Sequence, residues 1–92
     1  MIISWSEAAL IEVDAMLSDL RLYSAGAADR METDIKRAVR QLSSFPHSGR
    51  SVPEAEDTTI RELVLGRYRL LYRVSTEEAQ IIALHPAAIP LK

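Results

Sequence analysis

The chain contains no cysteine, which excludes disulfide bridges and thiolate chemistry. Its two histidines, His47 and His85, are isolated and offer no metal-ligand spacing. Long apolar runs are also missing, and none approaches the roughly 20 residues that a membrane-spanning helix needs. The opening stretch MIISWSEAAL lacks the basic region and the long apolar region of a secretory signal. These absences predict a cytoplasmic protein with no membrane segment, no metal and no cofactor.

A strong excess of charge is missing as well, because the formal net charge is only -2. The sequence holds 11 basic and 13 acidic residues. A protein that binds nucleic acid mainly through phosphates usually has a net basic domain, since the binding is driven by counterion release. The balance argues against general or sequence-specific nucleic-acid binding and leaves only a small local basic patch to consider.

What is present is enough for one compact domain. The chain has 92 residues, of which 48 % are hydrophobic, so we expect a single domain over residues 1–92. A chain of this size buries only about 60 to 65 % of the surface that it exposes when unfolded. Its margin of stability is therefore expected to be thin.

The first half of the chain predicts a strand followed by a helix. Residues 2–5 are short, apolar and β-prone. Ser6 follows as a helix N-cap, with Trp5 and Leu10 at the spacing of a hydrophobic staple. The helix is expected to run to about Tyr23. Its apolar stripe consists of Leu10, Val13, Leu17 and Leu20.

A second helix is predicted from about Ala27 to Phe45. It ends before Pro46, because a proline disfavours helical geometry in the residue before it. The short connection to the first helix favours an antiparallel helical hairpin. The apolar positions of the second helix are spaced by four, three, four and three residues: Met31, Ile35, Ala38, Leu42 and Phe45.

The second half of the chain predicts a three-stranded antiparallel meander over residues 60–85, after a surface loop at 46–57. Gly66-Arg67 fits a two-residue hairpin loop that would place Leu65 opposite Tyr68. The last strand is expected at residues 80–85.

The central strand has two unlike faces, because neighbouring side chains on a strand point to opposite sides. One face carries Tyr68, Leu70, Tyr72 and Val74, and the other carries Arg67, Arg69, Leu71 and Arg73. Glu62 is expected on the arginine face, opposite Leu71.

The predicted fold is therefore α+β, in the order β-α-α-β-β-β, with a helical hairpin packed on one face of an antiparallel sheet. Two helices cover only one side of a sheet. We expect the other side, with Arg69 and Arg73, to line a groove that is open to solvent or to a partner.

Four local sequence patterns resemble the RelE/ParE superfamily of toxins from bacterial type II toxin-antitoxin systems. They occur in the order that the superfamily shows and span nearly the whole chain. They are WSEAAL at residues 5–10, FPHSGRSVPE at 45–54, RELVLGRYRLLYRV at 61–74 and IIALH at 81–85. The resemblance implies the RelE/ParE-like fold and a toxin function.

The superfamily contains two kinds of toxin. RelE-like members are ribosome-dependent endoribonucleases that cleave messenger RNA, whereas ParE-like members inhibit DNA gyrase. Arg69 matches a central-strand arginine of the RelE-like set. Where RelE-like members place lysines before the hairpin, however, this chain has Glu54, Glu56 and Asp57, and His85 is followed by Pro-Ala-Ala instead of a basic residue. The sequence resembles ParE more closely, so we expect a gyrase-binding inhibitor with no catalytic residues.

The resemblance also implies a partner, since antitoxins of the superfamily wrap an amphipathic segment across the toxin's helices and sheet groove. We therefore expect a toxin-antitoxin hetero-oligomer. The alternatives are a RelE-like ribosome-dependent mRNA endoribonuclease and a degenerate member that only binds its antitoxin. Five residues are candidate contacts with the target or the antitoxin: Arg50, Arg61, Arg69, Arg73 and His85.

Each candidate also has a simpler interpretation. Arginines on the solvent side of a sheet are often solvated or paired with a carboxylate, and such pairs stabilise little. Glu62 is a ready partner for Arg69 or Arg73. His85 could pack at the sheet edge, because no carboxylate or serine lies near it in sequence.

Overall fold

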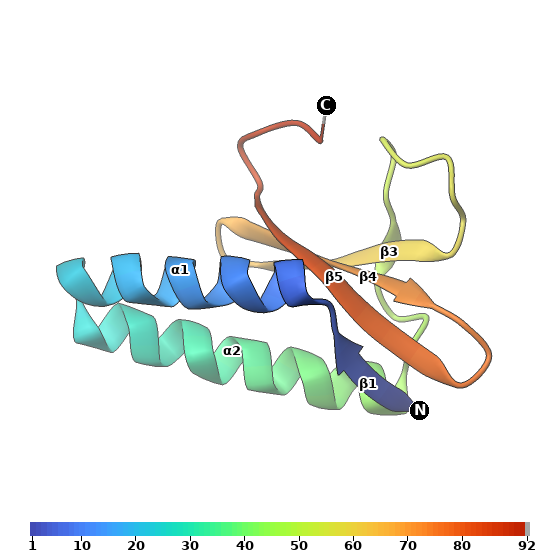
Figure 1. Cartoon of the computed structure of the whole chain (residues 1–92), viewed down its shortest axis with the longest axis horizontal. Helices are drawn as coiled ribbons and strands as arrows, with labels where there is room; N and C mark the ends of the chain where they lie inside the picture. The colour runs from blue at the N-terminus through green and yellow to red at the C-terminus, as the bar shows by residue number, and fades with distance from the viewer. Residues whose placement is uncertain (92) are drawn as a thin grey trace.

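The computed structural model describes residues 1–91, which form two helices and a five-stranded sheet (Figure 1). The elements in chain order are β1 (Ile2–Trp5), α1 (Glu7–Tyr23), α2 (Ala25–Ser44), β2 (Arg50–Ser51), β3 (Ile60–Leu65), β4 (Tyr68–Val74) and β5 (Glu78–Pro86). The strands lie in the order β1-β5-β4-β3-β2. No helix within residues 1–91 is long and apolar enough to cross a membrane.

The α+β class and the helical hairpin are confirmed, and the sheet differs in two details. It is mixed, because β1 pairs parallel with β5 while the other pairs are antiparallel. The segment predicted as a loop at 46–57 contains the short strand β2, which pairs with β3. The loop after β2 and the C-terminal segment rise together at the top of Figure 1, away from the helices.

Serine caps determine where the helices begin. The Ser6 hydroxyl accepts a hydrogen bond from the Ala9 amide over 3.1 Å, which confirms the predicted N-cap of α1. Ser24 ends α1 and begins α2, since its amide donates to the Leu20 carbonyl and its hydroxyl accepts from the Ala27 amide. This double role leaves a single residue between the helices and starts α2 two residues earlier than predicted.

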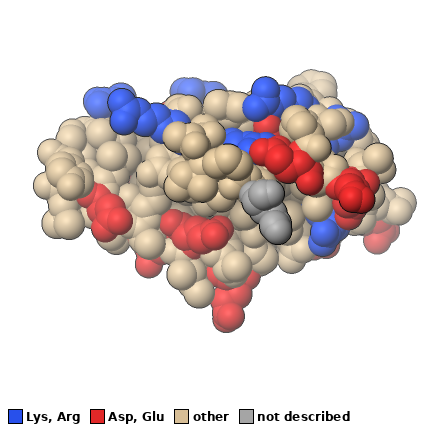
Figure 2. All heavy atoms as spheres, turned by 90° about the horizontal axis from the view of Figure 1, so that it is seen from above, with Lys and Arg blue, Asp and Glu red and all other residues tan. Residues whose placement is uncertain are grey.

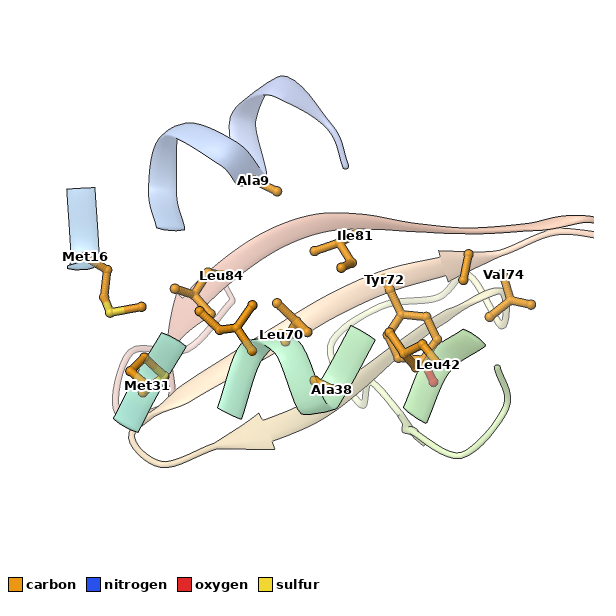
Figure 3. Packing of buried hydrophobic residues seen from close by; sticks show 12 residues of the cluster. Ala9, Met16, Met31, Ala38, Leu42, Leu70, Tyr72, Val74, Ile81 and Leu84 are labelled. Atoms are coloured by element: carbon orange, nitrogen blue, oxygen red, sulfur yellow. The ribbon is translucent and has the colours of Figure 1, made fainter. Parts of the chain in front are cut away.

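The hydrophobic core lies between the helices and one face of the sheet (Figure 3). α2 contributes Met31, Ile35, Ala38 and Leu42, as predicted. Two other predicted core positions are wrong, because Leu10 is 53 % exposed and Phe45 is 67 % exposed. Phe45 lies beyond the end of α2, where the helical periodicity no longer applies. On α1, Val13, Leu17 and Leu20 of the predicted stripe are partly buried against the core, and the fully buried positions are Ala9 and Met16.

The β3–β4 hairpin has the predicted register, with Leu65 opposite Tyr68 and Leu63 opposite Leu70. Gly66 has a φ of 59°, a left-handed conformation that glycine adopts without strain. This register places Glu62 opposite Leu71, also as predicted.

A β-bulge changes the face of the last strand. Leu71 of β4 lies opposite Ala83 and Tyr72 lies opposite Ile81, so Ile82 is the extra residue on β5. As a result both Leu84 and Ile81 are buried in the core with Tyr72. Strict alternation would have turned one of them to the opposite face.

Candidate functional site

The sheet face away from the helices carries an ion-paired network, which we call the arginine-carboxylate network and define as Arg50, Glu54, Glu62 and Arg69. β2, β3 and β4 supply Arg50, Glu62 and Arg69, and the loop after β2 supplies Glu54. Glu62 lies opposite Arg50 on one side and diagonal to Arg69 on the other. Long side chains at such diagonal positions can meet on one sheet face.

The guanidinium of Arg69 donates to both carboxylates. Its Nε donates to Glu62 Oε1 over 2.6 Å, and its Nη1 and Nη2 donate to the two oxygens of Glu54, each over 2.8 Å. The other oxygen of Glu62 accepts from Arg50 Nε. Two positive and two negative charges therefore neutralise each other in one cluster.

The centre of this network is buried. Glu62 is 1 % exposed and Arg69 is 6 % exposed. Buried charges need opposite charges and hydrogen bonds, because the loss of hydration costs several kcal/mol for each ion. Glu62 and Arg69 meet this requirement, because they bond to each other. Glu62 also bonds to Arg50, and Arg69 also bonds to Glu54.

Hydrogen bonding also shifts the protonation equilibria. The Arg69 guanidinium lowers the pKa of Glu54 from 4.5 to about 2, mainly through its hydrogen bonds to the carboxylate. The pKa of Arg69 is raised, first by its hydrogen bonds to Glu54 and further by those to Glu62. Both Glu54 and Arg69 are charged throughout the physiological pH range.

The burial of Arg69 corrects the prediction of an open cationic face. A groove of about 350 Å³ does exist on this side, and it is lined by Arg50, Pro53, Glu54, Val64, Arg69 and Ala87. The Arg69 guanidinium, however, is covered by Glu54, which reaches over it from the loop. Figure 2, which looks onto this side, shows basic side chains mostly along one long edge and separate acidic patches elsewhere on a surface made mainly of other residues.

The other candidate arginines are separated from one another. Arg73 is half exposed, with Nη2 3.6 Å from an oxygen of Asp57. The pKa of Asp57 is lowered mainly by hydrogen bonds from Thr59, and Arg73 contributes less. An exposed pair of this kind stabilises the fold little. Arg73 and the exposed side of Arg50 are two cations of this face that a partner can reach.

Arg61 lies on the opposite side of β3, because it pairs with the buried Tyr72. Its Nη1 donates to the Gly49 carbonyl over 2.8 Å. The Tyr72 hydroxyl accepts from the Gly49 amide over 2.9 Å. Burial raises the pKa of Tyr72. Arg61 and Tyr72 thus hold the segment that leads into β2.

His85 lies opposite Arg69 across β4 and β5. Its Nε2 is 2.7 Å from the Ile89 carbonyl oxygen. The Ala87 amide donates to the Arg67 carbonyl over 2.8 Å, so the chain turns directly after β5. These contacts give His85 a role in holding the C-terminal turn.

The sequence revealed only part of this site. Glu62 was expected beside Arg69 or Arg73, and the structure selects Arg69. In the sequence Glu54 stands out only as an acidic residue where RelE-like members place lysines. Its contact with Arg69 joins a loop to a strand across 15 positions, and only the acidity of the loop beside an arginine-rich strand pointed to it. The described residues contain no cluster of three metal-ligating side chains.

Comparisons with known proteins agree with the family resemblance found in the sequence. A family model described as "ParE toxin of type II toxin-antitoxin system, parDE" matches residues 3–87. A solved structure titled "Chromosomal ParDE TA system from P. aeruginosa" superposes with a TM-score of 0.71 at 26 % identity, covering 94 % of this chain and 95 % of that chain. For the "YoeB/ParE toxin from Agrobacterium tumefaciens" the TM-score is 0.66 at 15 % identity, with 94 % and 98 % covered, a likeness of fold alone. No curated protein sequence matches the chain significantly.

Proposed function

Because the chain belongs to the ParE toxin family of type II toxin-antitoxin systems, we propose that it inhibits DNA gyrase by binding it and performs no chemistry of its own. A cognate antitoxin neutralises it by forming a direct complex. The paired charges of the arginine-carboxylate network support binding over catalysis. The exposed apolar surface of α1 supports an antitoxin partner.

The state of Arg69 argues against RNA cleavage. An arginine that stabilises the transition state of phosphoryl transfer must direct its N–H groups at the charge that develops on the phosphate. In this chain the Nε, Nη1 and Nη2 groups of Arg69 all donate to carboxylates. A phosphate at this position would also meet the negative charges of Glu54 and Glu62. The geometry favours a protein-binding face over a nuclease site.

Two of the other candidate arginines do not converge on Arg69. Arg61 faces the helix side of the sheet, and Arg73 lies beside Asp57. His85 is held by the Ile89 carbonyl, and that contact offers no carboxylate or hydroxyl to assist it as a general base. Within residues 1–91, Arg50 and His85 do lie beside Arg69 on this face, but Arg50 and Arg69 are paired with Glu62 and His85 contacts the Ile89 carbonyl.

The apolar surface of α1 supports an antitoxin partner. Leu10, Ile11, Val13, Asp14 and Leu17 line a groove of about 360 Å³. Leu22 and Tyr23 protrude at the far end of the helical hairpin and are 85 % and 89 % exposed. Large exposed apolar patches mark interaction sites, and an amphipathic segment can cover a helix face of this kind.

Purified gyrase provides the direct test of the target. We expect the chain to inhibit DNA supercoiling while ribosome-bound messenger RNA stays intact. Inhibition should disappear when the antitoxin is added in equal amount. Unimpaired supercoiling together with cleavage of ribosome-bound message would show instead a RelE-like endoribonuclease.

Two matched variants test whether the sheet face takes part in gyrase inhibition. Arg73→Ala removes a reachable cation from this face, whereas Arg37→Ala removes an exposed arginine from α2. We expect only Arg73→Ala to weaken inhibition. Equal activity of the two variants would mean that Arg73 is merely solvated. If the chain affects neither supercoiling nor message but binds an antitoxin, it is a degenerate member of the family.

A further inference from the structure

Glu54 binds Arg69 in the manner of a ligand. Its two carboxylate oxygens accept from Nη1 and Nη2 in parallel, each over 2.8 Å. This bidentate arrangement is the geometry by which arginine recognises carboxylates in general. The groove above Arg69 is thus a complementary site for a planar anion, and a carboxylate of the same chain fills it.

The two carboxylates of the network are attached in different ways. The Glu62 side chain is fully buried on β3, between Arg50 and Arg69. The Glu54 side chain is 34 % exposed and comes from the loop that joins β2 to β3. Glu54 can leave Arg69 through a movement of the loop alone, whereas Glu62 cannot leave without disruption of the sheet.

We infer that the groove above Arg69 is a carboxylate-binding site that Glu54 occupies, and that an acidic side chain of a protein partner displaces Glu54 when it binds. The inference rests on the proposed function only in taking the partner to be a protein, the antitoxin. Arg69 keeps a bidentate partner before and after the exchange, so the exchange avoids the cost of leaving a buried charge unpaired.

The charge of the site selects a carboxylate over a phosphate. When Glu54 withdraws, Arg50 and Arg69 remain with the immovable Glu62, which leaves one net positive charge. A carboxylate neutralises that charge. A phosphate dianion brings a second negative charge close to Glu62, where burial strengthens the repulsion. The groove is therefore suited to an acidic side chain and poorly suited to a nucleic-acid backbone or to free phosphate.

Acetate binding tests whether the groove above Arg69 accepts a free carboxylate. Glu54→Ala empties the bidentate position, and Glu56→Ala removes the same charge from the same loop as a matched control. We expect acetate to shift the Arg69 Nε resonance saturably in Glu54→Ala at neutral pH. It should bind the parent chain and Glu56→Ala at least about tenfold more weakly, because tethered Glu54 competes at a millimolar or higher effective concentration.

Three results would overturn this assignment. They are the absence of a saturable shift in folded Glu54→Ala, the same acetate affinity in Glu54→Ala and Glu56→Ala, and tighter binding of inorganic phosphate than of acetate. The isosteric Glu54→Gln variant serves the same comparison if Glu54→Ala is poorly folded. None of these measurements depends on toxin activity, so a negative gyrase result leaves them intact.

Displacement by a partner is measured with the antitoxin. Removing an internal competitor should raise antitoxin affinity, so we expect Glu54→Ala to bind the antitoxin more tightly than Glu56→Ala does. An affinity that is equal or weaker would show that Glu54 is not displaced in the complex. The acetate titration would then support only the anion site that Glu54 occupies, and not its displacement by a partner.

Discussion

Glu62 and Arg69 lie diagonally across β3 and β4, and Arg69 Nε donates to Glu62 Oε1 over 2.6 Å. Both residues are buried. This pair is the fixed part of the arginine-carboxylate network. Its neighbours are more exposed, because Arg50 belongs to a two-residue strand and Glu54 to a loop. The network therefore combines a buried centre with a more exposed rim, and the two parts are expected to respond differently to mutation.

Arg69→Ala should destabilise the fold, because it leaves Glu62 buried with only Arg50 to balance its charge. We expect a loss of about 3 kcal/mol in the free energy of unfolding, measured by urea denaturation. Arg73→Ala, on the same strand and face but exposed, should cost no more than about 0.5 kcal/mol. A similar loss in both variants would contradict the importance of the buried pair. Replacing Glu62 and Arg69 together by leucine should restore part of the loss.

Gly49→Ala should be strongly destabilising. An added Cβ would lie 2.6 Å from the Glu62 carbonyl oxygen and 2.8 Å from Tyr72 Cε1, where neither backbone nor ring can easily move. Overpacking of this kind costs about 1 to 3 kcal/mol. Gly26→Ala is the control, since its added Cβ would meet the flexible end of Arg30 at 3.4 Å and the Ser24 hydroxyl at an ordinary contact distance of 3.8 Å. Thermal unfolding should show a lower Tm for Gly49→Ala and an equal or higher Tm for Gly26→Ala.

Tyr72→Phe should lower stability by about 1 to 2 kcal/mol, because it removes the acceptor of the buried Gly49 amide. Tyr23→Phe changes a residue that is almost fully exposed and should have no measurable effect. Urea denaturation of both variants checks this prediction. Equal stability would mean that water replaces the lost hydroxyl without cost.

Acid should weaken the loop contact. The pKa of Glu54 falls from 4.5 to about 2 in the folded chain, so its contribution to stability is complete above about pH 4.5 and is lost as the pH falls toward 2. We expect Tm to decline over this range in the parent chain. Glu54→Gln should decline less steeply, and Glu56→Gln should decline as the parent does. Identical pH profiles for all three proteins would contradict the ion pair with Arg69.

The exposed face of α1 should be required for binding the antitoxin and dispensable for folding. Leu10→Ser and Ile11→Ser remove apolar surface that is already more than half exposed. We expect Tm to change little and antitoxin affinity to fall, as measured by isothermal titration calorimetry. Ala15→Ser is a control at another exposed position of α1. Undiminished affinity would place the antitoxin elsewhere on the toxin.

Much of the fold could be predicted because it depends on local rules. The Ser6 cap, the four buried positions of α2 and the β3–β4 register each follow from residues that are close in sequence. Leu10 and Phe45 were predicted incorrectly, since periodicity shows which residues share a helix face but not how far the packed surface extends. The bulge at Ile82 could not be foreseen, because it depends on how β5 fits against both β4 and the helices.

The tyrosine face and the arginine face of the central strand follow directly from the order of its residues, because side chains alternate along any strand. The predicted hairpin register likewise places Glu62 on the arginine face. The burial and neutralisation of Arg69 become evident only in the folded chain, since they depend on where the loop places Glu54. Loop conformation is set by long-range contacts and not by local periodicity. The residue that most suggested an open cationic surface is for this reason the centre of a closed ion-paired network.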